Sequence, residues 1–117
     1  AYALHAPRMS LAMRGIANAF IAIKGCNQAF WREDLVAVNG FNEDFVGWGP
    51  EDKAIAARLQ RHGTRRQTLL FGGIAFHLDH PPAERARRAA NEQLLADTRA
   101  RRLARCEHGL EAHLRVL

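Results

Sequence analysis

The chain has 117 residues, of which 48% are hydrophobic and 25% charged, a composition typical of one globular domain rather than of a disordered segment. No apolar run reaches the roughly 20 residues that a membrane-spanning helix needs, so we expect a soluble protein. The formal net charge of +5 suits an anionic partner, such as nucleic acid, a phospholipid surface or a phosphorylated substrate, without choosing among them.

Helical and extended segments alternate in the first forty residues. Pro7–Asn18 is predicted to form a short basic helix, followed by a strand over Phe20–Gly25 and a second extended piece over Asn27–Trp31. Acids near the start and a closing Asn-Gly then predict a helix over Arg32–Val38.

A long loop and a well-marked helix come next. Glycines and acids without periodicity predict a loop over Phe41–Gly49, and long ordered loops in compact domains are usually functional. The helix after the loop has Pro50 at its first position, acids in its first turn and Gly63 just past its end. We therefore look for a functional site where this loop meets this helix.

The rest of the chain combines a strand-like region with a helical tail. Two apolar runs, Thr68–Phe71 and Ile74–Leu78, are separated by two glycines, which predicts a hairpin or a bent strand. The Ala-, Arg-, Glu- and Leu-rich sequence that follows predicts one long helix with a potential break near Gly109. We expect a mixed α/β body over residues 1–80 and a helical tail over residues 81–117.

Cysteine usage bears on the cellular compartment. Cys26 and Cys106 lie far apart, and neither belongs to a metal-type or redox-type pair such as C-x-x-C. A disulfide framework is therefore unsupported, and we expect a reducing, cytoplasmic setting.

The stretch Trp48-Gly49-Pro50-Glu51-Asp52 is the first candidate for chemistry. A flat aromatic ring can stack on a sugar, and a carboxylate can hold sugar hydroxyls or accept a proton from an attacking hydroxyl. The structural alternative is that Glu51 and Asp52 only complement the dipole of the helix that they open. The pair by itself does not decide between the two.

Two further clusters could bind a ligand. His77 and His80 end a predicted strand and could ligate a divalent metal, or they could be the exposed polar end of that strand. Gly25 and Asn27 follow an apolar strand, where a ligand could approach the backbone closely or where the chain only turns.

The Arg-rich tail offers a basic surface, and a solvated helix face is the alternative interpretation. The tail contains no aromatic residue that could stack on single-stranded nucleic acid, so nucleic acid is not the expected partner. The chain also lacks the G-x-x-x-x-G-K-[ST], G-x-G-x-x-G, G-x-S-x-G and Asp-x-Asp sequences.

Taken in order, KGCNQAFWREDLVAVNGFNEDFVGWGPEDKAIAARLQRHG followed by GGIAFHLDH resembles the C-terminal half of family 2-type glycosyltransferases, the part shared with the galactosyltransferase C-terminal region. The later NEQLL is similar to bacterial members linked to lipopolysaccharide or capsule sugars. The resemblance implies the α/β fold class, as an incomplete GT-A fold whose acceptor-side portion has a short mixed sheet and a long C-terminal helix. It also implies a nucleotide-sugar donor, inverting transfer to a glycan or lipopolysaccharide hydroxyl, and Mn²⁺ or Mg²⁺ on the donor diphosphate.

The resemblance assigns roles to the residues around the middle helix. Asp52 matches the family's usual base candidate, and Glu51 matches the acid that binds acceptor hydroxyls. Trp48 matches the aromatic wall of the acceptor site, with Gly49 beside it in the same motif. Pro50 departs from the galactosyltransferase version, which has glycine there, and this departure leaves the sugar specificity open.

The resemblance also assigns a metal site and a turn. His80 matches a histidine of the metal shell, and His77 matches a second, weaker ligand. Gly25 and Asn27 match the turn that lines the site.

The nucleotide-binding N-terminal half of this fold, with its Asp-x-Asp motif, is not in the sequence. We therefore expect the chain alone to be inactive, to bind metal weakly and to self-associate through apolar surface that the missing half would cover. The alternative function is a non-catalytic basic module that binds nucleic acid or an anionic membrane, peripherally at its inner face.

Overall fold

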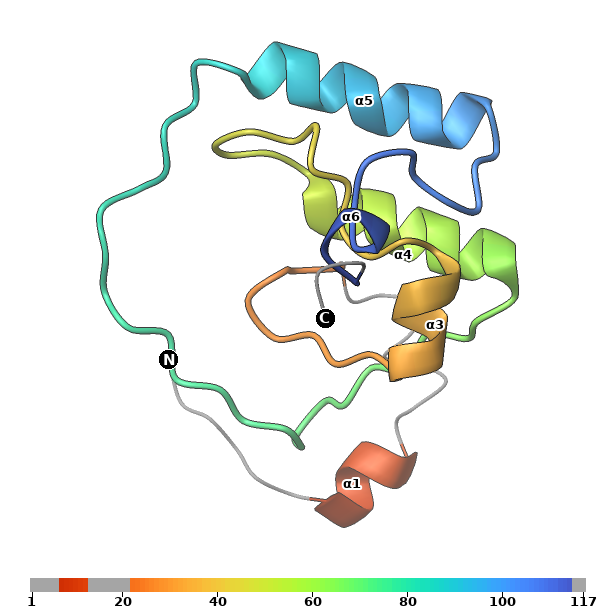
Figure 1. Cartoon of the computed structure of the whole chain (residues 1–117). Coiled ribbons are helices and arrows are strands. Elements are labelled where there is room, and N and C mark those ends of the chain that lie inside the picture. Colours follow the sequence, from red (N-terminus) through yellow and green to blue (C-terminus); the bar gives the residue numbers. More distant parts are fainter. Residues whose placement is uncertain (1–6, 13–21, 115–117) are drawn as a thin grey trace. The chain divides into compact units, whose positions relative to one another are not determined.

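The computed structural model describes residues 7–12 and 22–114, and Figure 1 shows the helices of this part of the chain. They are α1 (Pro7–Ala12), α3 (Arg32–Ala37), α4 (Glu51–His62), α5 (Arg88–Ala100) and α6 (Glu111–Leu114). The chain divides into two compact units, one of Ala1–Ala22 with Arg65–Asp79 and one of Ile23–Thr64 with His80–Leu117. None of the helices in the described ranges has the length and apolar character that crossing a bilayer requires.

The predicted α/β fold is wrong, and with it the incomplete GT-A architecture with a short mixed sheet. Within residues 7–12 and 22–114 there is no strand. Of the strand predicted over Phe20–Gly25, residues 20 and 21 lie outside the described part, and the others are irregular or begin a turn at Gly25. The piece predicted as extended over Asn27–Trp31 also forms no strand.

The apolar runs at 68–71 and 74–78 do not form a hairpin either. The chain turns over Leu70–Gly73, where the Gly72 amide donates to the Leu69 carbonyl at 3.2 Å and both Phe71 and Gly73 have positive φ angles, 63° and 59°. A strand needs a neighbouring strand for its backbone groups, and these described residues have none. The Phe76 and Leu78 side chains are accordingly 88% and 81% exposed.

The helices predicted before residue 64 are found in the described residues. The first predicted helix is confirmed over α1, and its remainder at 13–18 lies outside the described residues. The helix predicted over Arg32–Val38 is α3, with Val38 as its C-cap. The helix predicted to begin at Pro50 is α4, which begins one residue later with Pro50 as its N-cap and has Gly63 as its C-cap in the left-handed conformation, with a φ of 104°. Glycine adopts this conformation without the steric cost of a Cβ atom.

The apolar core of the second unit forms around one face of α4. Ile55 is fully buried and Leu59 nearly so, together with Val38 at the end of α3. The partly buried side chains of Phe30 and Leu35 pack against this cluster. Fully burying one such aliphatic side chain stabilises the fold by about 1.5–3 kcal/mol, so this small core holds α3 against α4.

The predicted long C-terminal helix is interrupted earlier than Gly109. Helix α5 packs against α4 and ends at Ala100, and Arg102 then has a φ of 52°. The chain returns without regular structure to the end of α3, where the short helix α6 begins after Gly109. A Cβ atom on Gly109 would lie 2.1 Å from the Asn39 carbonyl oxygen, so only glycine permits this approach.

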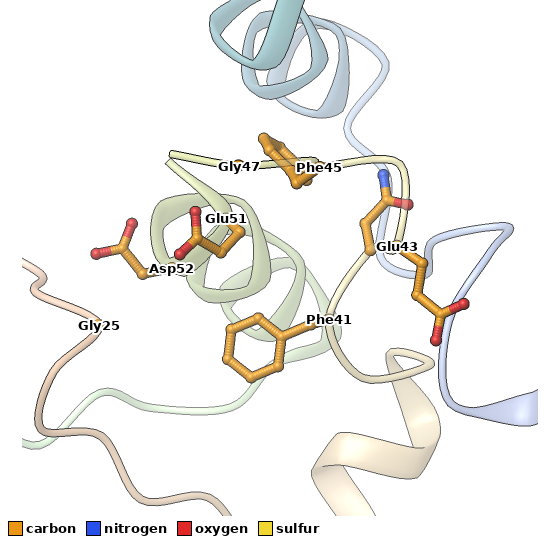
Figure 2. Close-up of a pocket in the computed structure, with 8 residues that line it drawn as sticks. Gly25, Phe41, Glu43, Phe45, Gly47, Glu51 and Asp52 are labelled. Carbon is orange, nitrogen blue, oxygen red and sulfur yellow. The ribbon is translucent and has the colours of Figure 1, made fainter. Parts of the chain in front are cut away.

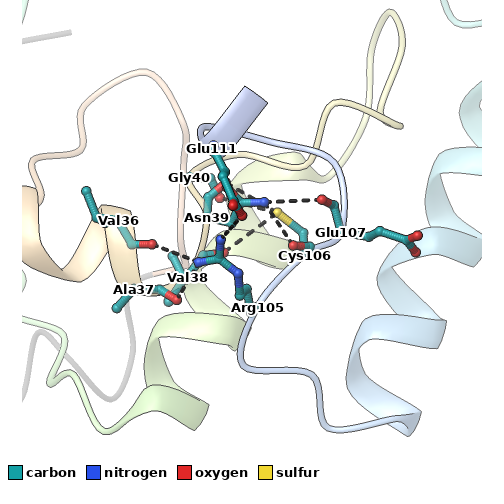
Figure 3. Close-up of polar contacts among 9 residues, drawn as sticks. All are labelled: Val36, Ala37, Val38, Asn39, Gly40, Arg105, Cys106, Glu107 and Glu111. Atoms are coloured by element: carbon teal, nitrogen blue, oxygen red, sulfur yellow. Dashed lines mark hydrogen bonds and ion pairs between the residues drawn. The ribbon is translucent and has the colours of Figure 1, made fainter. Parts of the chain in front are cut away.

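Polar contacts between Asn39, Arg105 and their neighbours attach the returning segment, as Figure 3 shows. The side-chain nitrogen of Asn39 donates to the Cys106 carbonyl at 3.0 Å, and its side-chain oxygen accepts from the Glu111 backbone amide at 2.7 Å. The Arg105 guanidinium donates to the carbonyls of Val36 and Ala37, which lie in the last turn of α3. The end of the predicted tail is therefore part of the same unit as α3 and α4.

Candidate functional site

A cavity of about 480 Å³ opens where the loop between α3 and α4 meets the first turn of α4. Figure 2 shows the carboxylates of Glu51 and Asp52 projecting from α4, with two aromatic rings of the loop nearby. Every lining residue belongs to the second unit: Gly25, Phe41, Asn42, Glu43, Phe45, Gly47, Glu51 and Asp52.

The two α4 carboxylates differ in their surroundings. Asp52 Oδ1 accepts a hydrogen bond from the Lys53 backbone amide at 2.7 Å, which orients the carboxylate at the helix start. Glu51 Oε2 is buried and has no hydrogen-bond partner among the described residues. A buried carboxylate oxygen without a partner is costly, so Glu51 offers an acceptor that a ligand hydroxyl could satisfy.

Gly25 lies against Asp52. A Cβ atom built on Gly25 would be 3.3 Å from Asp52 Cβ, closer than most side-chain contacts allow. The turn at Gly25 and Cys26 therefore approaches α4 closely, and a side chain at position 25 would crowd Asp52. Of the residues predicted from the sequence, the structure brings Gly25, Glu51 and Asp52 together around one cavity.

Helix α5 holds the loop that forms the other wall. The Asn91 side-chain amide is fully buried and donates to the carbonyls of Val46 and Trp48, each at 2.9 Å. A Cβ atom on Gly49 would lie 2.7 Å from the Asn91 amide nitrogen. The predicted site residue Gly49 thus allows α5 to pack on the loop, while it does not itself line the cavity.

Trp48 lies next to the cavity residue Gly47 in the loop and contacts the segment before α5. Its backbone amide donates to the Glu84 carbonyl at 2.9 Å, and the residue is 38% exposed. The guanidinium carbons of Arg85 and Arg88 each lie 5.3 Å from a ring centroid of Trp48, within the range of cation–π attraction.

The other predicted site residues lie elsewhere. Asn27 follows the turn at Gly25 and does not line the cavity. His77 belongs to the first unit and His80 to the second, where the His80 Nδ1 atom lies 2.9 Å from the Pro81 carbonyl oxygen. The described residues contain no group of three or more His, Cys, Asp or Glu side chains that could hold a metal ion. They do not fit a complete metal centre.

Two histidines from the C-terminal segment pair with acids of the loop. His108 Nδ1 lies 2.9 Å from Asp44 Oδ1, and His113 contacts the carboxylate of the cavity residue Glu43. The hydrogen bond to Asp44 and the charge of that carboxylate raise the pKa of His108. These pairs were not predicted, because nothing in the sequence indicates that residues 108 and 113 return to the loop.

A second cavity of about 390 Å³ lies between α4, α5 and the returning segment. The fully buried Arg58 lines it and donates from Nη2 to the Gly40 carbonyl at 2.7 Å. Burial lowers the pKa of the Arg58 guanidinium and raises the pKa of the Cys106 thiol. Arg58 therefore supports the loop at Gly40 from inside the unit.

A family model described as the N-terminal domain of galactosyltransferase matches residues 8–81, well over half of the chain. The chain belongs to this galactosyltransferase family. The match supports a glycosyltransferase domain and confirms the galactosyltransferase part of the resemblance. Its description refers to an N-terminal domain, so the assignment to a C-terminal half stays a prediction, as do family 2 and a bacterial type. No solved structure matches the chain.

Proposed function

We propose that this galactosyltransferase-like domain binds a glycan acceptor in the cavity at the start of α4 and that Asp52 acts as the base for inverting transfer from a nucleotide-sugar donor. The observation that supports the proposal most directly is the placement of Glu51 and Asp52 in one cavity with Gly25, inside a region that belongs to a galactosyltransferase family. A role in helix capping alone would not require a cavity in front of the carboxylates.

The proposed mechanism uses both carboxylates. Glu51, through the oxygen that has no partner among the described residues, holds one acceptor hydroxyl. Asp52 accepts the proton of the attacking acceptor hydroxyl while the oxygen of that hydroxyl forms a bond to the anomeric carbon of the donor sugar. The bond from that carbon to the nucleotide diphosphate breaks on the opposite face, and the nucleotide leaves with the electron pair, which inverts the configuration.

The start of α4 supports this arrangement, because Asp52 lies in the first turn of the helix and lines the cavity. Since the described residues do not fit a complete metal centre, no step is assigned to a metal held by this chain.

We further propose that the donor nucleotide is bound by a part of the protein that this chain lacks. No phosphate-binding glycine motif occurs in the sequence, and the cavity is lined by three acids, which repel a diphosphate. The chain alone is then inactive. Adding the nucleotide-binding part should restore transfer.

The test compares Asp52→Asn with a matched control. Transfer of label from UDP-galactose to methyl β-galactoside is measured with the chain alone and with protein expressed from its complete reading frame. Because Asp52→Asn removes the base, it should reduce transfer by the protein from the complete reading frame at least about 100-fold. Asp34→Asn is the control, because Asp34 also lies in the first turn of a helix, α3, but outside the cavity. Equal activity of the Asp52→Asn protein and the control would overturn the proposed role.

A further inference from the structure

Trp48 directly follows the cavity residue Gly47, and two cationic side chains lie over its ring. Arg85 and Arg88 both place their guanidinium groups 5.3 Å from its ring. The Trp48 backbone is held in place, because its amide donates to the Glu84 carbonyl and its carbonyl accepts from the buried Asn91 side chain. A partly exposed aromatic residue therefore lies beside two positive charges.

Both guanidinium groups keep donors for a further ligand. A guanidinium carries five N–H donors in its plane, and contact with an aromatic ring does not use them. Arg88 Nε donates to Glu92 Oε1 at 2.8 Å, which leaves its other N–H groups. Arg85 has no carboxylate partner among the described residues, and both side chains are exposed to solvent. Arg85 in particular has donors to offer to an anion.

Acidic side chains line the cavity, whereas two arginines from the start of α5 and the segment before it lie over the ring of Trp48. The cavity is lined by the acids Glu43, Glu51 and Asp52, and its lining residue Gly47 is followed directly by Trp48. A ligand that lies along the loop would therefore meet carboxylates at one end and guanidinium groups at the other. Hydroxyls suit the carboxylates, whereas the guanidinium groups are best matched by a carboxylate or a phosphate.

We propose that Arg85 and Arg88 form an anion-selective subsite beside Trp48, so that the acceptor is an acidic glycan. Its reacting hydroxyl lies in the cavity, and a neighbouring sugar with a carboxylate or phosphate group lies against Trp48. This inference rests on the proposed acceptor role of the cavity and adds the chemical class of the acceptor. It predicts selectivity for anionic sugars over neutral sugars of the same size.

The test uses the fluorescence of Trp48. Of the two tryptophans, Trp31 is 78% exposed, so a Trp31→Phe background leaves Trp48 as the reporter with little disturbance. This protein is titrated with methyl glucoside, glucuronate and glucose 6-phosphate, and with acetate and inorganic phosphate as anions without a sugar. The titrations are repeated with Arg85→Gln, Arg88→Gln and, as a matched control on the last turn of α5, Arg99→Gln.

One exposed charge-assisted contact should make glucuronate or glucose 6-phosphate bind about fivefold more tightly than methyl glucoside. Arg85→Gln should remove most of this preference, and Arg99→Gln should keep it. A stronger preference for one of the two acidic sugars would identify the carboxylate or the phosphate as the recognised group.

Four results would overturn the subsite. Equal binding of methyl glucoside and the acidic sugars would reject the anion preference and leave the acceptor cavity standing. An unchanged preference in Arg85→Gln, or an equal response to acetate and phosphate alone, would reject the assigned residues. If no sugar changes the fluorescence, the subsite fails, and the acceptor role of the cavity is decided by the Asp52→Asn assay. Because the Asp52→Asn assay does not depend on Trp48, the two proposals can fail separately.

Discussion

Helix α4 and the segment at 65–79 both carry aliphatic side chains close to glycines, yet these side chains end in opposite environments. In α4 the apolar side chains are buried, with Ile55 fully inaccessible, whereas Phe76 and Leu78 of the other segment remain more than 80% exposed. A helix satisfies its own backbone and then needs only one packed face, but an extended segment needs a second segment for its hydrogen bonds. The comparison shows why the candidate site lies on α4.

The largest expected effect comes from removing a side chain from each region. Ile55→Ala would leave a cavity in the small core around Val38 and Leu59 and should lower the free energy of unfolding by about 3 kcal/mol. Phe76→Ala removes an exposed ring and should change it by less than about 0.5 kcal/mol. Urea denaturation of both variants measures this difference. A large loss in Phe76→Ala would show that this segment is packed.

The second prediction concerns the glycine that lets the C-terminal segment approach Asn39. Gly109→Ala would place a methyl group 2.1 Å from the Asn39 carbonyl oxygen, and relieving this overlap should cost about 2–3 kcal/mol. Gly73→Ala is the control in the other segment, where the nearest side-chain atom would be 3.6 Å away and only the positive φ opposes alanine. That variant should lose about 1 kcal/mol. Equal losses would argue against the close approach at Gly109.

The third prediction concerns Asn91, whose hydrogen bonds join α5 to the loop beside the cavity. Asn91→Ala would leave the carbonyls of Val46 and Trp48 without their donor and should cost about 1–3 kcal/mol. Gln93→Ala, on an exposed position of the same helix, should be nearly neutral. Thermal unfolding measures both. The Trp48 fluorescence should shift in Asn91→Ala and not in Gln93→Ala.

The smallest effect is the pH dependence from His108. Its pKa in the folded protein is raised by Asp44, so the pair contributes stability fully below the ordinary histidine pKa of 6.5, and the contribution is lost as pH rises through the raised value. The wild-type protein should therefore lose more stability than His108→Gln between about pH 6 and pH 9. NMR titration of the His108 ring should show the raised pKa, which Asp44→Asn should abolish.

Part of the candidate site could be predicted from the sequence because its signals are local. The acids at 51 and 52, Pro50 before them and Gly63 after the helix act within single helical turns, and α4 forms as they indicate. The loop before α4 was predicted from its glycines and acids, and it contributes Phe41, Glu43 and Phe45 to the cavity. The placement of Gly25 against Asp52 came from the family resemblance, since the spacing of the two residues does not imply it.

What the amino-acid sequence determined by itself was therefore the position of α3 and α4, the acids that open α4 and the galactosyltransferase family to which the chain belongs. Only the tertiary structure decided that residues 74–78 form no strand, that Asn91 and Arg105 attach distant segments to the loop and to α3, and that Trp48 lies beside two arginines. The physical reason is the sequence separation over which each kind of interaction acts. Helix starts and stops depend on neighbours within one turn, whereas strand pairing and buried polar contacts join residues dozens of positions apart.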